Sequence, residues 1–323
     1  MIAITGAYGF IGSCLVNTLL QQGYNNIIAV DDFSQTLKSC NLPEHSHCLR
    51  VDRKKFFVWI DQEGKKLDWI IHLGARTDTT EQDETILLEW NVHFSMKVWQ
   101  KCCEYDIGLI YASSAATYGD GQTGFSDNHA LLPRLVPLNP YGWSKHHFDM
   151  WALSQKIKPP RWYGLKLYNI YGPNEYHKGK MASIVYQAYQ QITATGSMKL
   201  FKSYHPQYAD GRQLRDFLYV KDVLKIIVWL IFEMVAESGI YNVGKGNSDT
   251  FQDLVETVFE ALQVPVRIQY IDIPDTIKDQ YQYNTSADIR KLIRQGFELP
   301  FYSLREGIFD YINKYLQTNS FLH

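Results

Sequence analysis

The stretch MIAITGAYGFIGS at residues 1–13 decides the fold. Its short apolar run, rich in β-branched residues, predicts a buried strand that leads directly into Gly6, Gly9 and Gly12 and then into a helical pattern. Glycines at these steps allow a tight turn, a close approach of the backbone to a pyrophosphate, and packing of the helix on the strand. Because free N–H groups at the start of a helix attract anions, the stretch predicts a dinucleotide site.

A second strand pattern, IIAVD, ends on the acidic residue Asp31. Asp31 follows the glycines by about 20 residues, the distance at which a carboxylate binds the adenosine ribose. A carboxylate there hydrogen-bonds the free hydroxyls of NAD and repels the 2′-phosphate of NADP. Lys38 and Arg53 could offset that repulsion, or they could be plain surface charges. The residues alone therefore leave the choice between NAD and NADP open.

Strand-like runs alternate with helical patterns along most of the chain. The runs are MIAIT, NIIAVDD, LDWIIHLGA, IGLIYASSA, WYGLKLYNIYG and, later, GIYNVGKG; helices are expected at SIVYQAYQQI, VLKIIVWLIFEMV and FQDLVETVFEAL, a strand at VRIQYI, and a last helix after it. This alternation predicts an α/β fold with a Rossmann-type doubly wound parallel sheet and a smaller mixed α/β substrate-binding domain. We expect residues 1–168 plus 216–244 in the nucleotide-binding domain, and residues 169–215 plus 245–323 in the other.

The composition limits the kinds of partner. The 323 residues include 32 Lys and Arg and 34 Asp and Glu, which are dispersed and give a net charge of −2, so binding of nucleic acid or an anionic membrane is not expected. The longest apolar run, IIVWLIF, is too short to cross a bilayer, and the N-terminus shows no secretory pattern. Five cysteines without C-x-x-C spacing indicate reduced thiols and no metal site. We expect a cytoplasmic protein.

Tyr141 and Lys145 in NPYGWSKHH have the spacing that places both on one face of a helix. A tyrosine ordinarily loses its proton near pH 10, so it acts as a base at neutral pH only when nearby positive charge stabilises the phenolate. Lys145 and an oxidised nicotinamide supply that charge. Ser114, which follows the strand pattern IGLIYAS, can hold a reacting hydroxyl against the phenol. These three residues predict hydride chemistry at a carbinol.

The blocks SSAATYG, PYGWSK, LYNIYGP, HKGKMAS, RDFLYVKDV and YNVGKG resemble the extended short-chain dehydrogenase/reductase superfamily from end to end, and within it the ADP-glycero-manno-heptose 6-epimerases. SSAATYG and HKGKMAS favour this branch over the UDP-glucose 4-epimerases. The resemblance implies an isomerase that epimerises C6″ of ADP-D-glycero-D-manno-heptose through a transient ketone, for lipopolysaccharide core biosynthesis. It also implies tightly held NADP, with NAD as the alternative, and a homo-oligomer, for which a pentamer is one form.

The resemblance also assigns roles to residues. It implies that Tyr141 and Lys178 are two acid/base groups, that Lys145 contacts the cofactor ribose and the phenolate, and that Ser114 positions the hydroxyl. The cofactor contacts that it implies are Gly6, Gly9, Phe10, Ile11, Gly12, Asp31, Asp32, Lys38, Arg53, Leu73, Gly74, Ala75, Arg76, Thr77, Asn91, Lys145, Ile170 and Lys178. The substrate contacts are Ser114, Asn169, Lys180, Gln187, Phe201, Lys202, Ser203, Tyr204, Arg215 and Tyr281.

The chain departs from the family pattern on the substrate side. Lys180 stands where a small polar residue is usual, Gln187 stands where a histidine is usual, and residues 203–214 include an insertion. Lys180 could contact a substrate phosphate, lower the pKa of Lys178 through its charge, or point to water. Arg215 could clamp a diphosphate in a bidentate fashion, or only pair with the neighbouring aspartate.

Three other functions compete with this prediction. A 4,6-dehydratase would need an acid pair after Ser114, where this chain has Ala115, Ala116 and Thr117. A non-catalytic NAD(P)-binding protein would keep the glycines and lose the tyrosine–lysine pair. An epimerase of another nucleotide sugar, such as a UDP-hexose 4-epimerase, is the closest alternative, because it differs only in pocket shape and in its use of bases.

Overall fold

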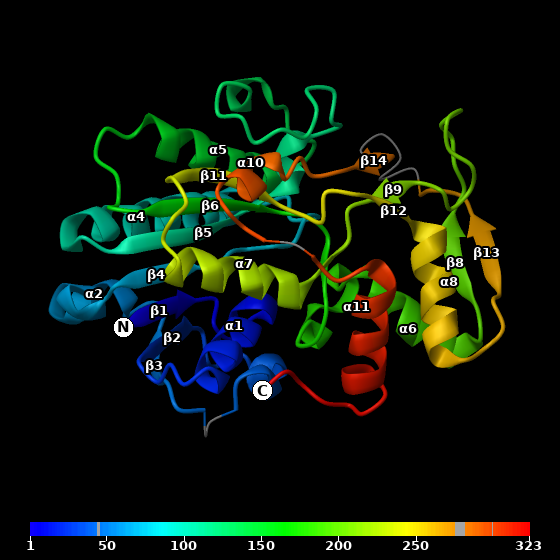
Figure 1. Ribbon diagram of the computed structural model, residues 1–323, viewed down its shortest axis with the longest axis horizontal. Coiled ribbons are helices and arrows are strands. Elements are labelled where there is room, and N and C mark those ends of the chain that lie inside the picture. The colour runs from blue at the N-terminus through cyan, green and yellow to red at the C-terminus, as the bar shows by residue number, and fades with distance from the viewer. Residues whose placement is uncertain (44–45, 275–281, 299) are drawn as a thin grey trace.

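The computed structural model describes residues 1–43, 46–274, 282–298 and 300–323, and it is built around a seven-stranded sheet (Figure 1). The strands lie in the order β11-β6-β5-β4-β1-β2-β3, and every neighbouring pair is parallel. Their bounds are β1 (Ile2–Thr5), β2 (Ile27–Asp31), β3 (Leu49–Asp52), β4 (Trp69–His72), β5 (Gly108–Ser114), β6 (Trp162–Leu167) and β11 (Gly239–Val243). This sheet confirms the predicted Rossmann-type α/β fold.

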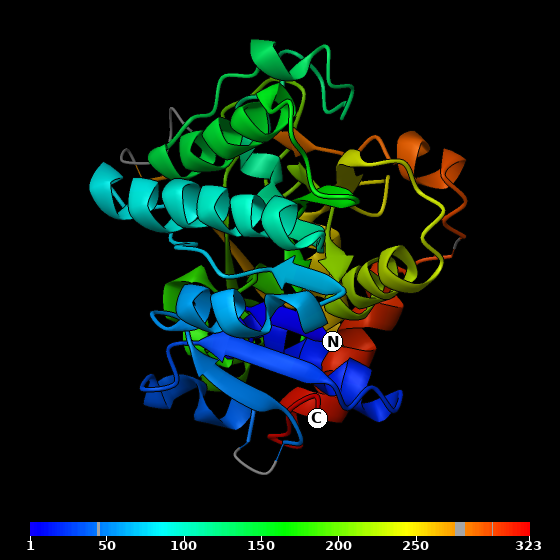
Figure 2. The same cartoon turned by 90° about the vertical axis from the view of Figure 1, so that its left-hand side faces the viewer.

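Helices cover both faces of the sheet. The α-helices are α1 (Phe10–Gln21), α2 (Phe56–Glu63), α3 (Glu84–Leu87), α4 (Phe94–Tyr105), α5 (Pro140–Ser154), α6 (Ile184–Thr195), α7 (Val220–Phe232), α8 (Phe251–Leu262), α10 (Arg290–Arg294) and α11 (Leu304–Tyr311). Shorter 3₁₀ or π segments are η1 (Thr36–Asn41), η2 (Gly64–Lys66), η3 (Leu88–His93), η4 (Ala115–Tyr118), η5 (Leu132–Arg134), η6 (Tyr176–Met181) and η7 (Ile312–Leu316). Figure 2 shows the cyan α4 and the green α5 side by side on one side of the sheet.

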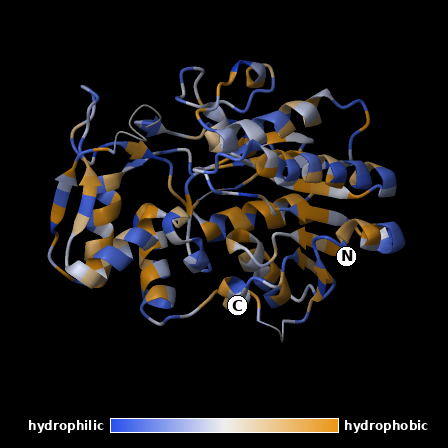
Figure 3. Cartoon of the chain, turned by 180° about the vertical axis from the view of Figure 1, so that it is seen from behind, coloured by the Kyte–Doolittle hydropathy of each residue, from blue (hydrophilic) through white to orange (hydrophobic). Residues whose placement is uncertain are grey.

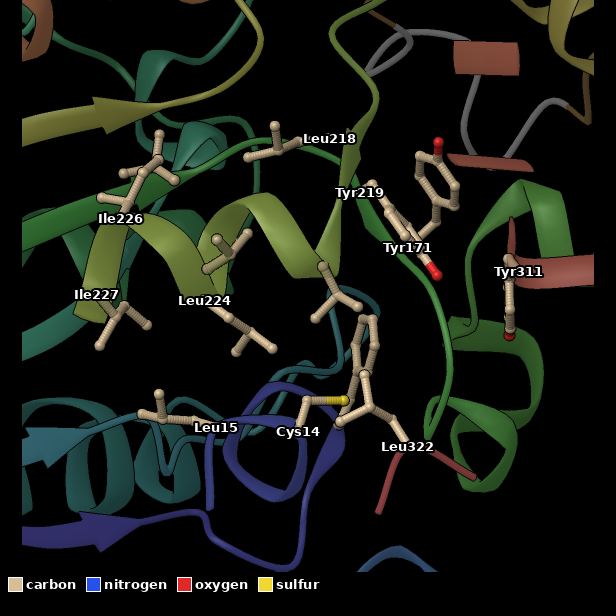
Figure 4. Close-up of a cluster of buried hydrophobic side chains, with 14 of the residues drawn as sticks. Cys14, Leu15, Tyr171, Leu218, Tyr219, Leu224, Ile226, Ile227, Tyr311 and Leu322 are labelled. Atoms are coloured by element: carbon tan, nitrogen blue, oxygen red, sulfur yellow. The ribbon is translucent and has the colours of Figure 1, made fainter. Parts of the chain in front are cut away.

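Side chains that alternate along the strands enter two separate hydrophobic cores. Ile2 and Ile4 of β1 pack in the core that includes α1 and α7, whereas Ala3 packs in the core that includes α2, α4 and α5. Figure 4 shows part of the first core, with Cys14 of α1 close to side chains of α7. Seen from behind, the strands of the large sheet are coloured as mostly hydrophobic (Figure 3). Burial on both faces explains why these strands read as continuous apolar runs.

After β6 the chain leaves the sheet, returns to it, and leaves it again. Strands of the first excursion pair with strands that come later in the chain. β7 (Ile170–Tyr171) pairs with β10 (Leu218–Tyr219), and β8 (Met198–Phe201) pairs with β13 (Ile268–Ile271). The short strands β12 (Asp249–Thr250), β9 (Leu214–Arg215) and β14 (Asn284–Thr285) form a third small sheet. These elements lie with α6 and α8 toward the right of Figure 1. The division into two domains at the expected residues stays a prediction.

Most predicted elements are present, with three differences. The run WYGLKLYNIYG is two strands, β6 and β7, because Tyr168 and Asn169 leave the ladder between them. The helix expected at 223–235 begins one turn earlier, at Val220, and ends before Met234, which has a left-handed φ of 51°. The edge strand β3 was not predicted, because only Val51 of its four residues is buried. Among the described residues, no helix has the length and apolar character needed to cross a membrane.

Candidate active site

The glycine turn between β1 and α1 forms a cradle that only glycine can build. Gly6 has a φ of +72°, and a Cβ on Gly12 would lie 2.1 Å from the carbonyl oxygen of Gly6. Gly9 precedes the first residue of α1, and no side chain caps that helix end. Its free backbone N–H groups therefore face the turn, where the backbone can approach a pyrophosphate closely. The residues present fit a dinucleotide.

A cavity of about 860 Å³ runs from this turn along the carboxyl ends of the strands. This is the place where open α/β sheets bind ligands, and the volume is in the upper part of the range for small-molecule sites. Most of the predicted site residues line it. They are Gly6, Gly9, Phe10, Ile11, Gly12, Asp31, Asp32, Lys38, Arg53, Leu73, Gly74, Ala75, Arg76, Thr77, Ser114, Tyr141, Lys145, Asn169, Ile170 and Lys178.

The acidic end of β2 is held in place by backbone donors. The carboxylate of Asp31 accepts the N–H of Tyr8 at 2.9 Å and the N–H of Asp32 at 2.7 Å. Arg53 lies 3.4 Å from the Asp32 carboxylate, and its guanidinium lies 4.2 Å from the ring centre of Trp90. The buried Nε of Arg53 has no hydrogen-bond partner among the described residues. Lys38 lines the same part of the cavity, so both cations border the cavity and are not plain surface charges.

Asn91 is the one predicted cofactor residue that does not line the cavity. It lies in the π-helical segment η3, where its side chain bonds both the N–H and the carbonyl oxygen of Arg76, at 2.8 and 3.0 Å. It also donates to Ser144 at 2.9 Å, and Ser144 donates to the carbonyl oxygen of Tyr141 at 2.7 Å. Asn91 therefore ties the loop after β4 to the helix that carries the tyrosine, from behind the cavity wall.

The predicted reaction centre lies where α5 meets the end of β5. Asn139 caps α5 by accepting the N–H of Gly142 at 2.7 Å, and Tyr141 follows in the first turn. Burial raises the pKa of Tyr141, and a hydrogen bond with Ser114 opposes that shift. The ammonium of Lys145 donates to the carbonyl oxygen of Ala112 at 2.9 Å, and burial lowers its pKa to about 8. The expected i, i+4 face is thus confirmed in geometry.

Lys178 enters the cavity from the other side of the sheet. Its ammonium lies 5.5 Å from the ring centre of Phe10, the first residue of α1, whereas α5 packs on the opposite face. Burial lowers the pKa of Lys178, and the charge of Glu175 opposes that shift. Gly179, with a φ of +54°, turns the chain so that Lys180 is exposed and does not line the cavity.

Buried polar side chains hold the Lys178 segment in place. Glu175 accepts the N–H and the hydroxyl of Ser183, at 2.6 and 2.7 Å. Asn41 donates to the carbonyl oxygens of Tyr8 and Asn174, at 3.2 and 3.0 Å, and its Nδ2 lies 3.1 Å from Nδ1 of His177. One asparagine thus joins the glycine turn to the residue before Lys178. No motif pointed to it, because an isolated asparagine carries no pattern in a sequence.

The predicted substrate contacts lie mostly outside the cavity lining. Gln187 donates to the carbonyl oxygens of Ala182 and Lys180, at 2.7 and 3.2 Å, so it supports the loop and does not face the cavity. Arg215 donates to the carbonyl oxygens of Leu214, at 2.8 Å, and Gln282. Arg215, Phe201, Lys202, Ser203 and Tyr204 do not line the cavity, and Tyr281 lies outside the described residues.

The segment after β8 is bonded within itself and to the residue that follows β13. Lys202 and the Tyr204 hydroxyl both contact Asp272, at 3.2 and 2.6 Å, and the N–H of Ser203 donates to Asp210 at 2.7 Å. Toward α6 and α8 the cavity is lined instead by side chains that were not predicted. These are Met181, Ile184, Phe217 and Phe251. They come from three separate stretches of the chain, and each reads in the sequence as an ordinary core residue.

Three comparisons place the chain among known proteins. Residues 2–244 match the model of the NAD dependent epimerase/dehydratase family. The ADP-L-glycero-D-manno-heptose-6-epimerases of Fusobacterium nucleatum and Nitratidesulfovibrio vulgaris are 40% and 42% identical to it, each over 98% of both chains. The crystal structure of the Helicobacter pylori ADP-L-glycero-D-manno-heptose-6-epimerase has a TM-score of 0.79 and 27% identity, over 97% of this chain and 95% of that one. The chain therefore belongs to the NAD dependent epimerase/dehydratase family, whose members use a nicotinamide cofactor, and within it to the ADP-L-glycero-D-manno-heptose-6-epimerases.

Proposed function

We propose that the protein converts ADP-D-glycero-D-manno-heptose into ADP-L-glycero-D-manno-heptose by epimerisation at C6″. One observation carries the proposal. Two titratable side chains, Tyr141 on α5 and Lys178 on η6, reach one cavity from opposite faces of the sheet. An epimerase that oxidises and then reduces one carbon needs a proton carrier on each side of that carbon, because the two epimers present their hydroxyls in different directions.

The first proton transfer belongs to Tyr141. With Lys145 charged beside it, the phenol can give up its proton at neutral pH and then accept the proton of the C6″ hydroxyl. Ser114 holds that hydroxyl against the phenolate through its own hydrogen bond. The nicotinamide, when bound, supplies the hydride acceptor and donor that make the oxidation reversible. Nothing is consumed, so the cofactor can stay bound between turnovers.

The second proton transfer belongs to Lys178. Burial lowers the pKa of Lys178, which favours the neutral amine more than in a lysine exposed to water. A lysine with this property can take a proton from, or return one to, the oxygen of the turned substrate. Lys180 does not share this role, because it is exposed and lies outside the cavity lining.

The cofactor that fits best is NADP. Lys38 and Arg53 place two cations beside Asp31 and Asp32, where a 2′-phosphate would need charge compensation. Residues 1–168 plus 216–244 then form the NADP-binding domain, and residues 169–215 plus 245–323 bind the nucleotide sugar. We also propose that the enzyme works in the cytoplasm as a homo-oligomer, for which a pentamer is one form.

The test uses the purified protein without added cofactor. Incubation with ADP-D-glycero-D-manno-heptose should produce the L-glycero epimer, followed by NMR of the C6″ proton. UDP-glucose serves as the parallel substrate, because a UDP-hexose 4-epimerase is the alternative function. Turnover of UDP-glucose to UDP-galactose without any change in the heptose would overturn the proposal. Mass spectrometry of the cofactor released on denaturation distinguishes NADP from NAD.

A further inference from the structure

A buried ion pair lies behind the reaction centre, and the proposed chemistry does not use it. The ammonium of Lys166 in β6 lies 2.7 Å from the carboxylate of Asp149 in α5, and neither side chain is exposed to solvent. Replacing a buried ion pair by apolar side chains of similar volume is often neutral or stabilising, because removing two charges from water is costly. The stability of the fold therefore does not explain why the chain keeps this ion pair.

Both members of the pair make further hydrogen bonds. Asp149 also accepts the hydroxyls of Ser113, at 2.7 Å, and Tyr111, at 3.1 Å. Lys166 also donates to the Thr117 hydroxyl at 2.6 Å. Three donors on one carboxylate keep its negative charge at a defined point inside the protein.

That point lies one helical turn from Lys145. The spacing i, i+4 puts Asp149 and Lys145 on the same face of α5, the face that packs on β5. Lys145 donates to Ala112, and Asp149 accepts from Ser113, so consecutive residues of β5 fix the two side chains against the same strand. Lys166, in contrast, reaches the carboxylate from β6.

We propose that Asp149, paired with Lys166, is a positioning residue that holds Lys145 protonated and in place beside Tyr141. The inference deepens the proposed function, on which it rests. The carboxylate acts through Lys145 and touches neither cavity nor substrate, since it does not line the cavity. Without it, Lys145 would more readily lose the charge that stabilises the phenolate.

The other titratable groups around Lys145 do not supply this charge. His72, in β4, is neutral, because burial and the charge of Lys145 lower its pKa to about 3. Tyr111, in β5, stays protonated, because burial raises the pKa of its phenol. Lys166 and Lys178 have basic side chains and cannot supply a negative charge, and Tyr141 is the group that Lys145 serves. Asp149 opposes the effect of burial on the pKa of Lys145.

The test measures the protonation of Lys145 directly. Competitive acetylation with acetic anhydride across pH, read by mass spectrometry of the peptide, gives the pH midpoint at which Lys145 becomes reactive. In D149N that midpoint should fall by about one pH unit, the size expected when an opposite charge nearby is lost. The basic limb of kcat/KM for the heptose substrate should move to lower pH by the same amount.

Two further variants make the result decisive. D149N leaves Lys166 unpaired, so the double variant D149N/K166M, which buries no orphan charge, must show the same lowered midpoint. Y111F removes one hydrogen bond and keeps the ion pair, so its midpoint should equal that of the unchanged protein. A midpoint in D149N/K166M equal to that of the unchanged protein would overturn the proposal, since Asp149 would then serve only to pair Lys166.

The labelling needs no sugar nucleotide. If the unchanged protein fails to epimerise the heptose, the proposed function fails, whereas the midpoints of Lys145 still decide the role of Asp149. If epimerisation occurs and the midpoints do not move, only the role of Asp149 fails.

Discussion

Around the glycine turn the cavity is walled by backbone, and around Phe217 and Phe251 it is walled by side chains. The first region consists of the turns that follow β1 and β4, where Gly6 and Gly74 approach so closely that a Cβ on either would crowd the other. The second region consists of Met181, Ile184, Phe217 and Phe251. A backbone wall tolerates few substitutions, whereas a side-chain wall can change shape without changing the fold. The difference indicates that the second region can vary in shape while the glycine turn stays constant.

The largest effect should come from breaking the backbone wall. Gly12→Ala places a methyl group 2.1 Å from the carbonyl oxygen of Gly6, so the turn must open. We expect the purified variant to carry no cofactor, measured by absorbance and mass spectrometry, and to be inactive. The control is Gly196→Asn, at a left-handed helix C-cap with open space around it, a conformation that asparagine tolerates. Retention of cofactor by the Gly12 variant would show that the turn is less constrained than its geometry indicates.

Tyr141→Phe tests the chemistry and leaves the wall intact. Loss of an acid/base group should lower kcat about 10³-fold, within the range measured for general acid–base catalysis. Bound cofactor should stay at the level of the unchanged protein. Tyr24→Phe, at an exposed tyrosine, is the control. A decrease in kcat smaller than tenfold would remove Tyr141 from the reaction centre.

Lys178→Met tests whether the second face of the sheet supplies a base. We expect kcat for epimerisation to fall about 10²-fold or more, with cofactor still bound. The neighbouring Lys180→Met is a matched control, because Lys180 is exposed and does not line the cavity. If the Lys178 variant turns over about as fast as the control, Lys178 takes no part in the proton transfers. Tyr141 would then be the one base so far identified.

The pH dependence of the reaction should report Lys145. Burial lowers the pKa of this lysine to about 8, so the ammonium is present below that pH and is lost as the pH rises through it. Because the phenolate of Tyr141 depends on that charge, kcat/KM should fall above about pH 8, by up to tenfold per pH unit for one group. A profile that stays flat up to pH 9.5 would contradict the assignment.

The smallest effect should be a change in cofactor preference. Arg53→Gln removes a cation beside Asp32, and one charge-assisted hydrogen bond to a phosphate is worth about 1.5–3 kcal/mol, so the preference for NADP over NAD should fall at least tenfold. Competition between the two cofactors for the stripped protein measures it. Arg50→Gln, on the strand that ends just before Arg53 but outside the cavity lining, should leave the preference unchanged. An unchanged preference in the Arg53 variant would place the 2′-phosphate elsewhere.

The sequence predicted the two sides of the cavity unequally. The glycine turn, Asp31 and the pair Tyr141 and Lys145 lie in the cavity as expected, because each comes from a short local pattern with a fixed geometry. Asn91 was predicted to contact the cofactor, but it lies behind the wall and bonds the backbone of Arg76. A residue that supports the cavity lining through one intervening residue cannot be distinguished in a sequence from a residue that contacts the ligand directly.

Most of the predicted substrate contacts lie outside the cavity lining and stay predictions. Gln187 and Lys202 have polar side chains that suit a ligand, yet they bond neighbouring carbonyl and carboxylate groups in the structure. Phe217 and Phe251 line the cavity although they read as core residues. Which polar group faces a ligand depends on the path of the backbone around it, and that path is set by contacts between distant segments.

By itself the sequence determined the Rossmann-type sheet, the dinucleotide turn and the helix face that carries Tyr141 and Lys145. These follow from neighbours in the chain, whose spacing fixes their geometry. Only the tertiary structure decided that Lys178 faces the cavity while Lys180 faces solvent, and that Asp149 lies paired with Lys166 behind Lys145. The physical reason is that the positive φ of Gly179 and the meeting of α5 with β6 arise when separate segments pack, and no local pattern records them.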